Sequence, residues 1–125
     1  MAMHILPTAL LMFATSSAWA DWVQYAESAR SVYYLDPATI RQNGNLRTVW
    51  ELSDLKERDP DGELSRRALM EYDCDGERLR TLSLSTHSGP MATGKVLVTA
   101  SDSTWDYVAP GTIGDAALRL VCAAS

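Results

Sequence analysis

The sequence predicts an α+β fold, an antiparallel sheet of about five to six strands with a C-terminal helix packed on one face. Most of the chain consists of short stretches rich in aromatic and β-branched residues, separated by turn residues, which is typical of antiparallel strands. The final stretch, residues 112–125, instead spaces its apolar residues at helical intervals. A helix this short is marginal alone in water, so we expect it to pack on the sheet.

The first twenty residues, MAMHILPTALLMFATSSAWA, predict a secretory signal peptide. They carry no Lys, Arg, Asp or Glu, contain an apolar run from Ile5 to Ala14, and end in the small-x-small pattern Ala18-Trp19-Ala20. The alternatives, a membrane anchor or a buried helix, are disfavoured because the run is too short to span a bilayer and Pro7 interrupts it. We therefore expect an exported protein with one domain over residues 21–125 and no transmembrane segment. No Cys follows the cleavage site, so we expect no lipid anchor and a soluble product in the periplasm or outside the cell.

Both cysteines, Cys74 and Cys122, lie in the expected mature domain. An even number of cysteines in an exported chain favours a disulfide over a metal site or a catalytic thiol. The alternative is a pair of unpaired buried thiols, which an oxidising compartment disfavours. The predicted disulfide would tie the C-terminal helix to the sheet.

The N-terminal half predicts strands at residues 22–28 and 31–36, joined by Ala29-Arg30, and one helical turn where Asp36 caps Pro37. After an Asn43-Gly44 turn, polar and apolar residues alternate in the next strand. Alternate residues of a strand lie on opposite faces, so this strand has two sets of side chains. We expect the first set to face the core: Leu46, Thr48, Trp50 and Leu52. The second set would face solvent: Arg47, Val49, Glu51 and Ser53.

The C-terminal half begins with an exposed charged loop at residues 55–63, followed by the strongest hairpin pattern in the chain, which turns at Asp75-Gly76. The spacing of apolar residues shifts after Leu79, which predicts a bulge near Arg80-Thr81. Further strands are expected at residues 95–101 and 105–111. The last helix is predicted from Ile113, Ala116, Ala117, Leu120 and Val121, with Thr112 as its cap and Asp115 three residues on.

A phosphate-binding loop is suggested by Gly89, four residues, Gly94 and Lys95, but Val96 stands where a Ser or Thr would hold Mg²⁺. A true phosphate loop leads into a helix, whereas Val96-Leu97-Val98-Thr99 predicts a strand. We therefore interpret the segment as a connection between two strands and Lys95 as an exposed cation.

Seven pieces of the chain occur in a characteristic order: Trp22, VYYLDPATI (Val32–Ile40), LRTVWEL (Leu46–Leu52), EYDC (Glu71–Cys74), LSLSTHSGPMATGKVL (Leu82–Leu97), Trp105 and APGTIGDAALRLVC (Ala109–Cys122). With the two cysteines, they resemble the surface-adhesin protein E family of Gram-negative bacteria over nearly the whole mature chain. The resemblance implies a curved antiparallel sheet of about six strands, with the helix disulfide-tied to one face. It also implies adhesion to host extracellular proteins.

The formal net charge of −5 disfavours a nucleic-acid partner and electrostatic membrane binding.

Few residues of the chain could act in catalysis or bind a metal. After cleavage His87 is the sole histidine, and we expect it in an exposed turn rather than in a catalytic site. DPDG (Asp59–Gly62) and DCDG (Asp73–Gly76) lack the remaining ligands of a calcium loop, so we interpret both as turns. The sequence thus predicts no enzyme, cofactor or metal.

Aromatic residues favour a binding module instead. Tyr33 and Tyr34 are adjacent, so in a strand they point to opposite faces, and one of them would lie on a face that the helix leaves uncovered. Family adhesins carry a long basic arm, whose nearest equivalent here is a set of arginines on the central hairpin. The candidate partner-binding residues are Tyr33, Tyr34, Arg66, Arg67, Arg78, Arg80 and Lys95.

We therefore expect a non-enzymatic binding module of the bacterial envelope that acts as an adhesin on a protein partner. The alternative is a soluble periplasmic protein with a role in envelope assembly or small-ligand binding. An exposed edge strand would also allow a homodimer.

Overall fold

The computed structural model describes residues 20–124. The predicted signal peptide lies outside this range except for Ala20, so export stays a prediction. The elements in chain order are β1 (Val23–Glu27), β2 (Ser31–Leu35), the 3-10 turn η1 (Pro37–Thr39), β3 (Arg41–Asn43), β4 (Leu46–Leu55), β5 (Ser65–Asp73), β6 (Arg78–His87), β7 (Val96–Ala100), β8 (Asp106–Tyr107) and α1 (Ile113–Ala123).

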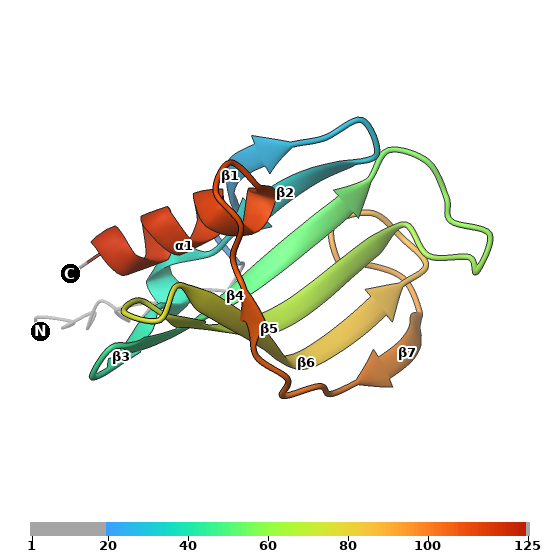
Figure 1. The fold of residues 1–125 in the computed structure, drawn as a ribbon. Coiled ribbons are helices and arrows are strands. Elements are labelled where there is room, and N and C mark those ends of the chain that lie inside the picture. Colours follow the sequence, from blue (N-terminus) through green and yellow to red (C-terminus); the bar gives the residue numbers. More distant parts are fainter. Residues whose placement is uncertain (1–19, 125) are drawn as a thin grey trace, which may run out of the picture.

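One antiparallel sheet contains all eight strands. Its main path runs β1-β2-β4-β5-β6-β7, while the short β3 pairs with β4 and β8 pairs with β6. Figure 1 shows these six strands curling into a half-barrel, with the red helix α1 across one face. The predicted fold class is confirmed, β8 lies within the strand expected at residues 105–111, and the short β3 is a strand that the sequence did not indicate. In the described residues, no helix is long and apolar enough to cross a membrane.

The hydrophobic core lies between α1 and the sheet. Val49 of β4 and Tyr72 of β5 face Ala117 and Val121 of the helix, and all four are almost completely buried. Burial of a large apolar side chain contributes about 1.5–3 kcal/mol, which is what holds this short helix in place. The helix begins as predicted, because the Thr112 hydroxyl accepts a hydrogen bond from the backbone N–H of Asp115.

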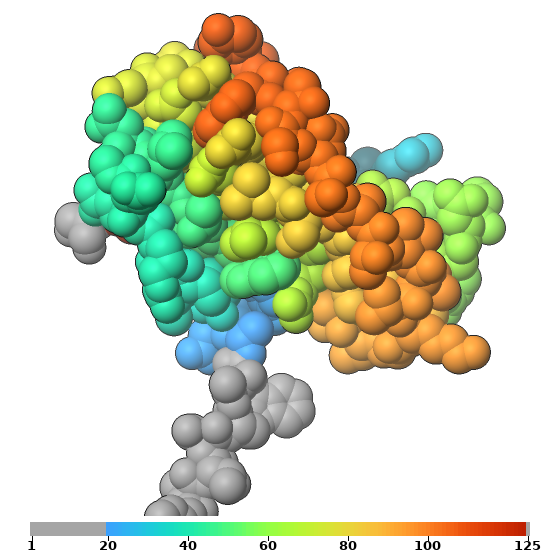
Figure 2. Space-filling view, turned by 90° about the horizontal axis from the view of Figure 1, so that it is seen from below, coloured from blue at the N-terminus to red at the C-terminus, as the bar shows by residue number. Residues whose placement is uncertain are grey.

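The expected core-facing set of β4 is wrong. The helix packs against the set that contains Val49 and Glu51, and the alternation therefore directs Trp50 to the opposite face. The physical reason is that buried Glu51 is hydrogen-bonded by two tyrosine hydroxyls, so a charged residue type does not mark the solvent side here. Leu52 is also buried, but outside the cluster under the helix. Figure 2 shows the face opposite α1, with green and yellow-green atoms of β4 and β5 at its centre.

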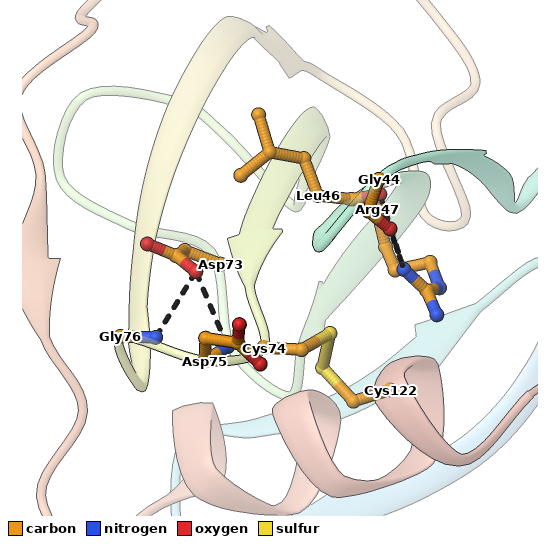
Figure 3. Close-up of a disulfide and its surroundings, with 8 residues drawn as sticks. All are labelled: Gly44, Leu46, Arg47, Asp73, Cys74, Asp75, Gly76 and Cys122. Atoms are coloured by element: carbon orange, nitrogen blue, oxygen red, sulfur yellow. Dashed lines mark hydrogen bonds between the residues drawn. A yellow bond between two sulfur atoms is a disulfide. The ribbon is translucent and has the colours of Figure 1, made fainter.

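The predicted disulfide is confirmed between Cys74, which directly follows β5, and Cys122 in the last turn of α1, with a Cα–Cα distance of 5.7 Å. Figure 3 shows this link beside the turn that joins β5 to β6. In that turn, an Asp73 carboxylate oxygen accepts hydrogen bonds from the backbone N–H groups of Asp75 and Gly76. The disulfide therefore joins the helix to a turn that is itself held by side-chain bonds.

The predicted bulge is confirmed on β6. The register changes from Leu69 opposite Ser83 to Met70 opposite Thr81, so Leu82 is the additional residue. The single extra residue sits just beyond the predicted Arg80-Thr81 position. Because of this extra residue, Arg80 before the bulge and Ser83 after it lie on the same face of the sheet, opposite Glu71 and Leu69.

Candidate partner-binding face

The strand register places a set of polar and aromatic side chains on the sheet face that α1 leaves uncovered. Residues opposite each other in an antiparallel pair share a face, and the pairs Trp50–Leu69, Leu52–Arg67 and Glu71–Arg80 all lie opposite the helix side. We call this surface the helix-free face. Its members on β4, β5 and β6 are Thr48, Trp50, Leu52, Arg67, Leu69, Glu71, Asp73, Arg78, Arg80, Ser83, Ser85 and His87.

Arg67 and Trp50 form the first unit of this face. The guanidinium carbon of Arg67 lies 4.3 Å from the centroid of the Trp50 ring. Such a cation–π contact contributes about 0.5–1 kcal/mol at an exposed site and holds the guanidinium flat. None of the ion pairs among residues 20–124 includes Arg67. Arg67 therefore presents a positioned, uncompensated positive charge to solvent.

Trp105 organises the second unit. The segment before β8 runs beside β6, because Tyr107 pairs with Arg78, and this places the Trp105 ring against two arginines. The guanidinium carbons of Arg78 and Arg80 lie 4.4 and 4.3 Å from its centroid. Figure 2 shows the orange segment that carries Trp105 along one side of this face.

Each of these two arginines also pairs with a carboxylate of β5. Arg78 Nε donates to Asp73 Oδ2 at 2.9 Å, and Arg80 Nε donates to Glu71 Oε1 at 2.7 Å. The Gly76 N–H and then the Arg78 guanidinium lower the pKa of Asp73, so this carboxyl stays ionised. In the second unit, the charges of both arginines are therefore balanced by carboxylates beside the Trp105 ring. Arg67, in contrast, has no such partner.

His87 lies at the end of β6 and closes this face. It is buried rather than in an exposed turn, so that expectation is wrong. The loop at residues 88–95 folds back here, since the Met91 and Ala92 N–H groups donate to Asp54 Oδ1 and Ser65 Oγ of the neighbouring strands. His87 Nε2 lies 2.8 Å from Ser85 Oγ. Burial, and then the charge of Arg67, lower the pKa of His87, so the imidazole is neutral at pH 7.

The opposite side of the sheet holds a buried carboxyl that the sequence did not reveal. Tyr25 donates a 2.7 Å hydrogen bond to Glu51 Oε1, and the Tyr72 hydroxyl donates to Glu51 Oε2. Burial raises the pKa of both Glu51 and Tyr72 above their ordinary values. This cluster is enclosed beneath α1. It forms part of the core packing between the helix and the sheet.

The family model for surface-adhesin protein E matches residues 22–123. The chain belongs to the surface-adhesin protein E family. Solved structures of Haemophilus influenzae protein E share its fold. One crystal form gives a TM-score of 0.67 at 14% identity, covering 84% of this chain and 89% of that one. Protein E from non-typeable Haemophilus influenzae gives 0.60 at 14% identity, covering 86% and 79%. No curated protein sequence matches the chain.

In this member of the protein E family, the predicted partner-binding residues fall into three groups. Arg67, Arg78 and Arg80 share the helix-free face, and Tyr34 joins them because it pairs with Leu52. Tyr33 and Arg66 instead line a depression on the other side of the sheet. Lys95 is exposed in the loop before β7, apart from both.

Sequence reasoning missed that tryptophans organise the arginines. Trp50 was expected in the core, and Trp105 was noted without a partner. The signal that could have revealed the face is the spacing of Arg78 and Arg80, two residues apart in a strand, which puts both on one side. Which ring they contact depends on the path of residues 101–105, and no local pattern gives that path.

Proposed function

We propose that this protein is an exported, non-enzymatic binding module of the bacterial envelope, an adhesin that uses the helix-free face to recognise host extracellular proteins. Membership of a surface-adhesin family supports this function. The observation that carries it is the set of arginines stacked on tryptophans, with Arg67 on Trp50 and two arginines on Trp105. Tryptophan and arginine are the residue types that dominate the energetics of protein interfaces.

The charges of this face indicate the chemistry of the protein partner. Arg78 and Arg80 are already paired with acids, whereas Arg67 is not. A partner that places a carboxylate on Arg67 gains a charge-assisted, bidentate hydrogen bond without first breaking an ion pair. The indole of Trp50 keeps the guanidinium in place, so little side-chain entropy is lost on binding. The partner surface should therefore combine an acidic residue with apolar contacts.

The side chains of the described residues support a role without catalysis. His87, the one histidine within residues 20–124, is buried and bonded to Ser85 instead of facing a cleft with a carboxylate behind it. Both cysteines are used in the disulfide. A binding role needs none of these groups. It needs a stable sheet that presents fixed side chains.

The test measures capture of the purified protein by immobilised host extracellular-matrix proteins. We expect Arg67→Ala and Trp105→Ala each to weaken the binding of a captured matrix protein by at least about tenfold. The control is Arg119→Ala, which removes another exposed arginine from α1 on the other side of the sheet. Failure to capture any matrix protein, or equal affinities for the three variants, would contradict the proposal.

Export and location need their own test. We infer from the first twenty residues and the family that the protein crosses the inner membrane, without a lipid anchor. Fractionation of the producing cell should find it with an N-terminus at Asp21, and partly on the surface or in the medium. A protein confined to the periplasm would contradict the adhesin role and favour envelope assembly or small-ligand binding.

The protein could also assemble as a homodimer, and the exposed edge strand β7 is the feature that favours this. This edge strand is exposed throughout, with Val96, Leu97 and Val98 at 56%, 41% and 56% exposure. Uncharged edge strands of this kind pair readily with a second strand. We infer that β7 pairs with β7 of another copy. Sedimentation should then show a dimer that Val98→Lys converts to a monomer, and a wild-type monomer would exclude this pairing.

A further inference from the structure

A depression of 640 Å³ lies at one end of the sheet, away from the helix-free face. It is formed by the β1–β2 turn and the β4–β5 loop, which Figure 1 shows side by side at the same end. The six side chains that matter to its chemistry are Arg30, Tyr33, Ser53, Lys56, Arg58 and Arg66. Tyr33, Ser53 and Arg66 belong to the face opposite Trp50, because they pair in register with one another across β2, β4 and β5.

The charge of this depression is opposite to that of the whole chain. Four cationic side chains line it, Arg30, Lys56, Arg58 and Arg66, against two acidic ones, Glu57 and Asp59. The chain as a whole has a formal net charge of −5. The lining therefore carries two more positive than negative side chains, although the protein as a whole is acidic.

Two of the four cations already pair with acids. Arg66 donates from Nε to Glu63 Oε2 at 3.0 Å and reaches Asp59 Oδ2 at 3.8 Å. Lys56 Nζ lies 2.8 Å from Glu27 Oε1. These pairs shape the wall of the depression. They leave Arg30 and Arg58 to supply its free positive charge.

Arg58 is held in position by neutral groups. Its guanidinium donates to the carbonyl oxygens of Gly62 at 2.8 Å and Ser88 at 2.7 Å. These bonds fix the side chain but do not cancel its charge, so the remaining N–H groups can donate to an anion. Arg30 takes part in no ion pair within residues 20–124. Arg66 balances only one of its two acids, Glu63 and Asp59, so the carboxylates near the two free arginines are Glu57 and one acid of the Arg66 cluster.

We propose that this depression binds an anionic small molecule, a sulfate or phosphate ester of sugar size, with the acid group held by Arg30 and Arg58 and the uncharged part against Tyr33. The volume is in the range of small-ligand sites, roughly 300–1,000 Å³, and exceeds what an inorganic anion would fill. The Ser53 hydroxyl provides a further hydrogen-bonding group in the wall. This site goes beyond the proposed adhesin function, because it involves another face and another class of ligand.

The experiment is a titration of the ¹⁵N-labelled protein, followed by NMR, with three probes: a sulfated disaccharide, glucose 6-phosphate and unmodified glucose. We expect saturable shifts of the amide signals of residues 29–31 and 55–59 with at least one anionic sugar. Comparison of the two anionic sugars distinguishes a sulfate source from a phosphate source. The proposal is overturned if neither produces saturable shifts, or if glucose produces the same ones.

Variants assign the binding to the two free arginines. Arg30→Gln and Arg58→Gln should each lower the affinity for the anionic sugar by about tenfold or more, because each removes a charged hydrogen-bond donor. The matched control is Arg41→Gln on β3, at the other end of the sheet, since Arg41 also donates to two backbone carbonyls and to no acid. Unchanged affinity in Arg30→Gln, or an equal loss in Arg41→Gln, would overturn the site. Because none of these residues lies on the helix-free face, failure here leaves matrix-protein capture unaffected.

Discussion

Cys74, directly after β5, is bonded to Cys122 in the last turn of α1 across a separation of 48 residues. The same helix buries Val121 and Ala117 against the sheet, so the covalent link and the core hold the same two elements together. The disulfide therefore limits how far the helix can leave the sheet, even in partly unfolded states.

Removal of the disulfide should lower stability strongly. In the chain-entropy model, a loop of this length contributes about 4 kcal/mol to the free energy of unfolding. We expect the double variant Cys74→Ser/Cys122→Ser to lose about that amount in urea unfolding, and reductant to lower the melting temperature of the wild type. Reductant should not change the variant. A wild-type melting temperature that is unaffected by reductant would contradict a stabilising role for this link.

Buried Glu51 should make stability depend on pH in the opposite sense to a paired surface carboxylate. Burial raises its pKa in the folded state, so the folded protein binds this proton more tightly than the unfolded chain does. The contribution of Glu51 to stability is therefore fully present below the unfolded pKa of about 4.3 and is lost as pH rises through the folded pKa. Ionised, the carboxylate is a buried charge that only Tyr25 and Tyr72 solvate.

The test compares the wild type with Glu51→Gln, which has the same shape and cannot ionise. The free energy of unfolding, measured in urea between pH 4 and pH 7, should fall for the wild type relative to the variant as pH rises. The difference between the two proteins isolates Glu51 from carboxyls such as Asp73 and Asp115, whose lowered pKa values act in the opposite direction. A difference that is constant with pH would show that Glu51 does not change its protonation on folding.

Gly76 should be required for close approach rather than for backbone conformation. Its φ is not in the left-handed region, but a Cβ at this position would lie 2.6 Å from Asp73 Oδ2. The Asp73 carboxylate cannot move freely, since it accepts from the Gly76 and Asp75 N–H groups and from Arg78. We expect Gly76→Ala to cost about 1–2 kcal/mol in free energy of unfolding.

A double-mutant cycle with Asp73→Ala tests that cause. In the Asp73→Ala background the added Cβ has no carboxylate to displace, so Gly76→Ala should cost clearly less than in the wild type. Equal costs in both backgrounds would mean that the contact with Asp73 is not the reason for the glycine.

Local signals explain how much of the fold could be predicted. Turn residues, the helical spacing after Thr112 and the shift in apolar spacing at Leu82 are all readable within a few neighbours, and each corresponds to an observed feature. The short strand β3 was not foreseen, because Arg41-Gln42-Asn43 has no apolar alternation and is held by its pairing with β4.

Contacts between distant residues explain what could not be predicted. The burial of Glu51 depends on Tyr25 and Tyr72, which are 26 and 21 residues away, and no pattern within β4 indicates them. Likewise, the stacking of Trp105 on two arginines depends on the path of a segment without regular structure. The arginines of the candidate site could be named from sequence, but their division between two faces required the register.

The loop at residues 88–95 stores backbone strain that a single substitution should release. Ala92 has a φ of +59°, in the left-handed region that costs a residue with a Cβ about 1–2 kcal/mol, and it is held there because its N–H donates to Ser65 Oγ at 2.9 Å. Ala92→Gly removes that cost but gains unfolded-state entropy of about 0.4–1 kcal/mol, so we expect a net stabilisation of roughly 0.5 kcal/mol. Ala100→Gly on β7 is the control, because φ is not positive there and the same change should destabilise. Urea unfolding of both variants decides the matter, since two destabilised proteins would show that Ala92 is not strained.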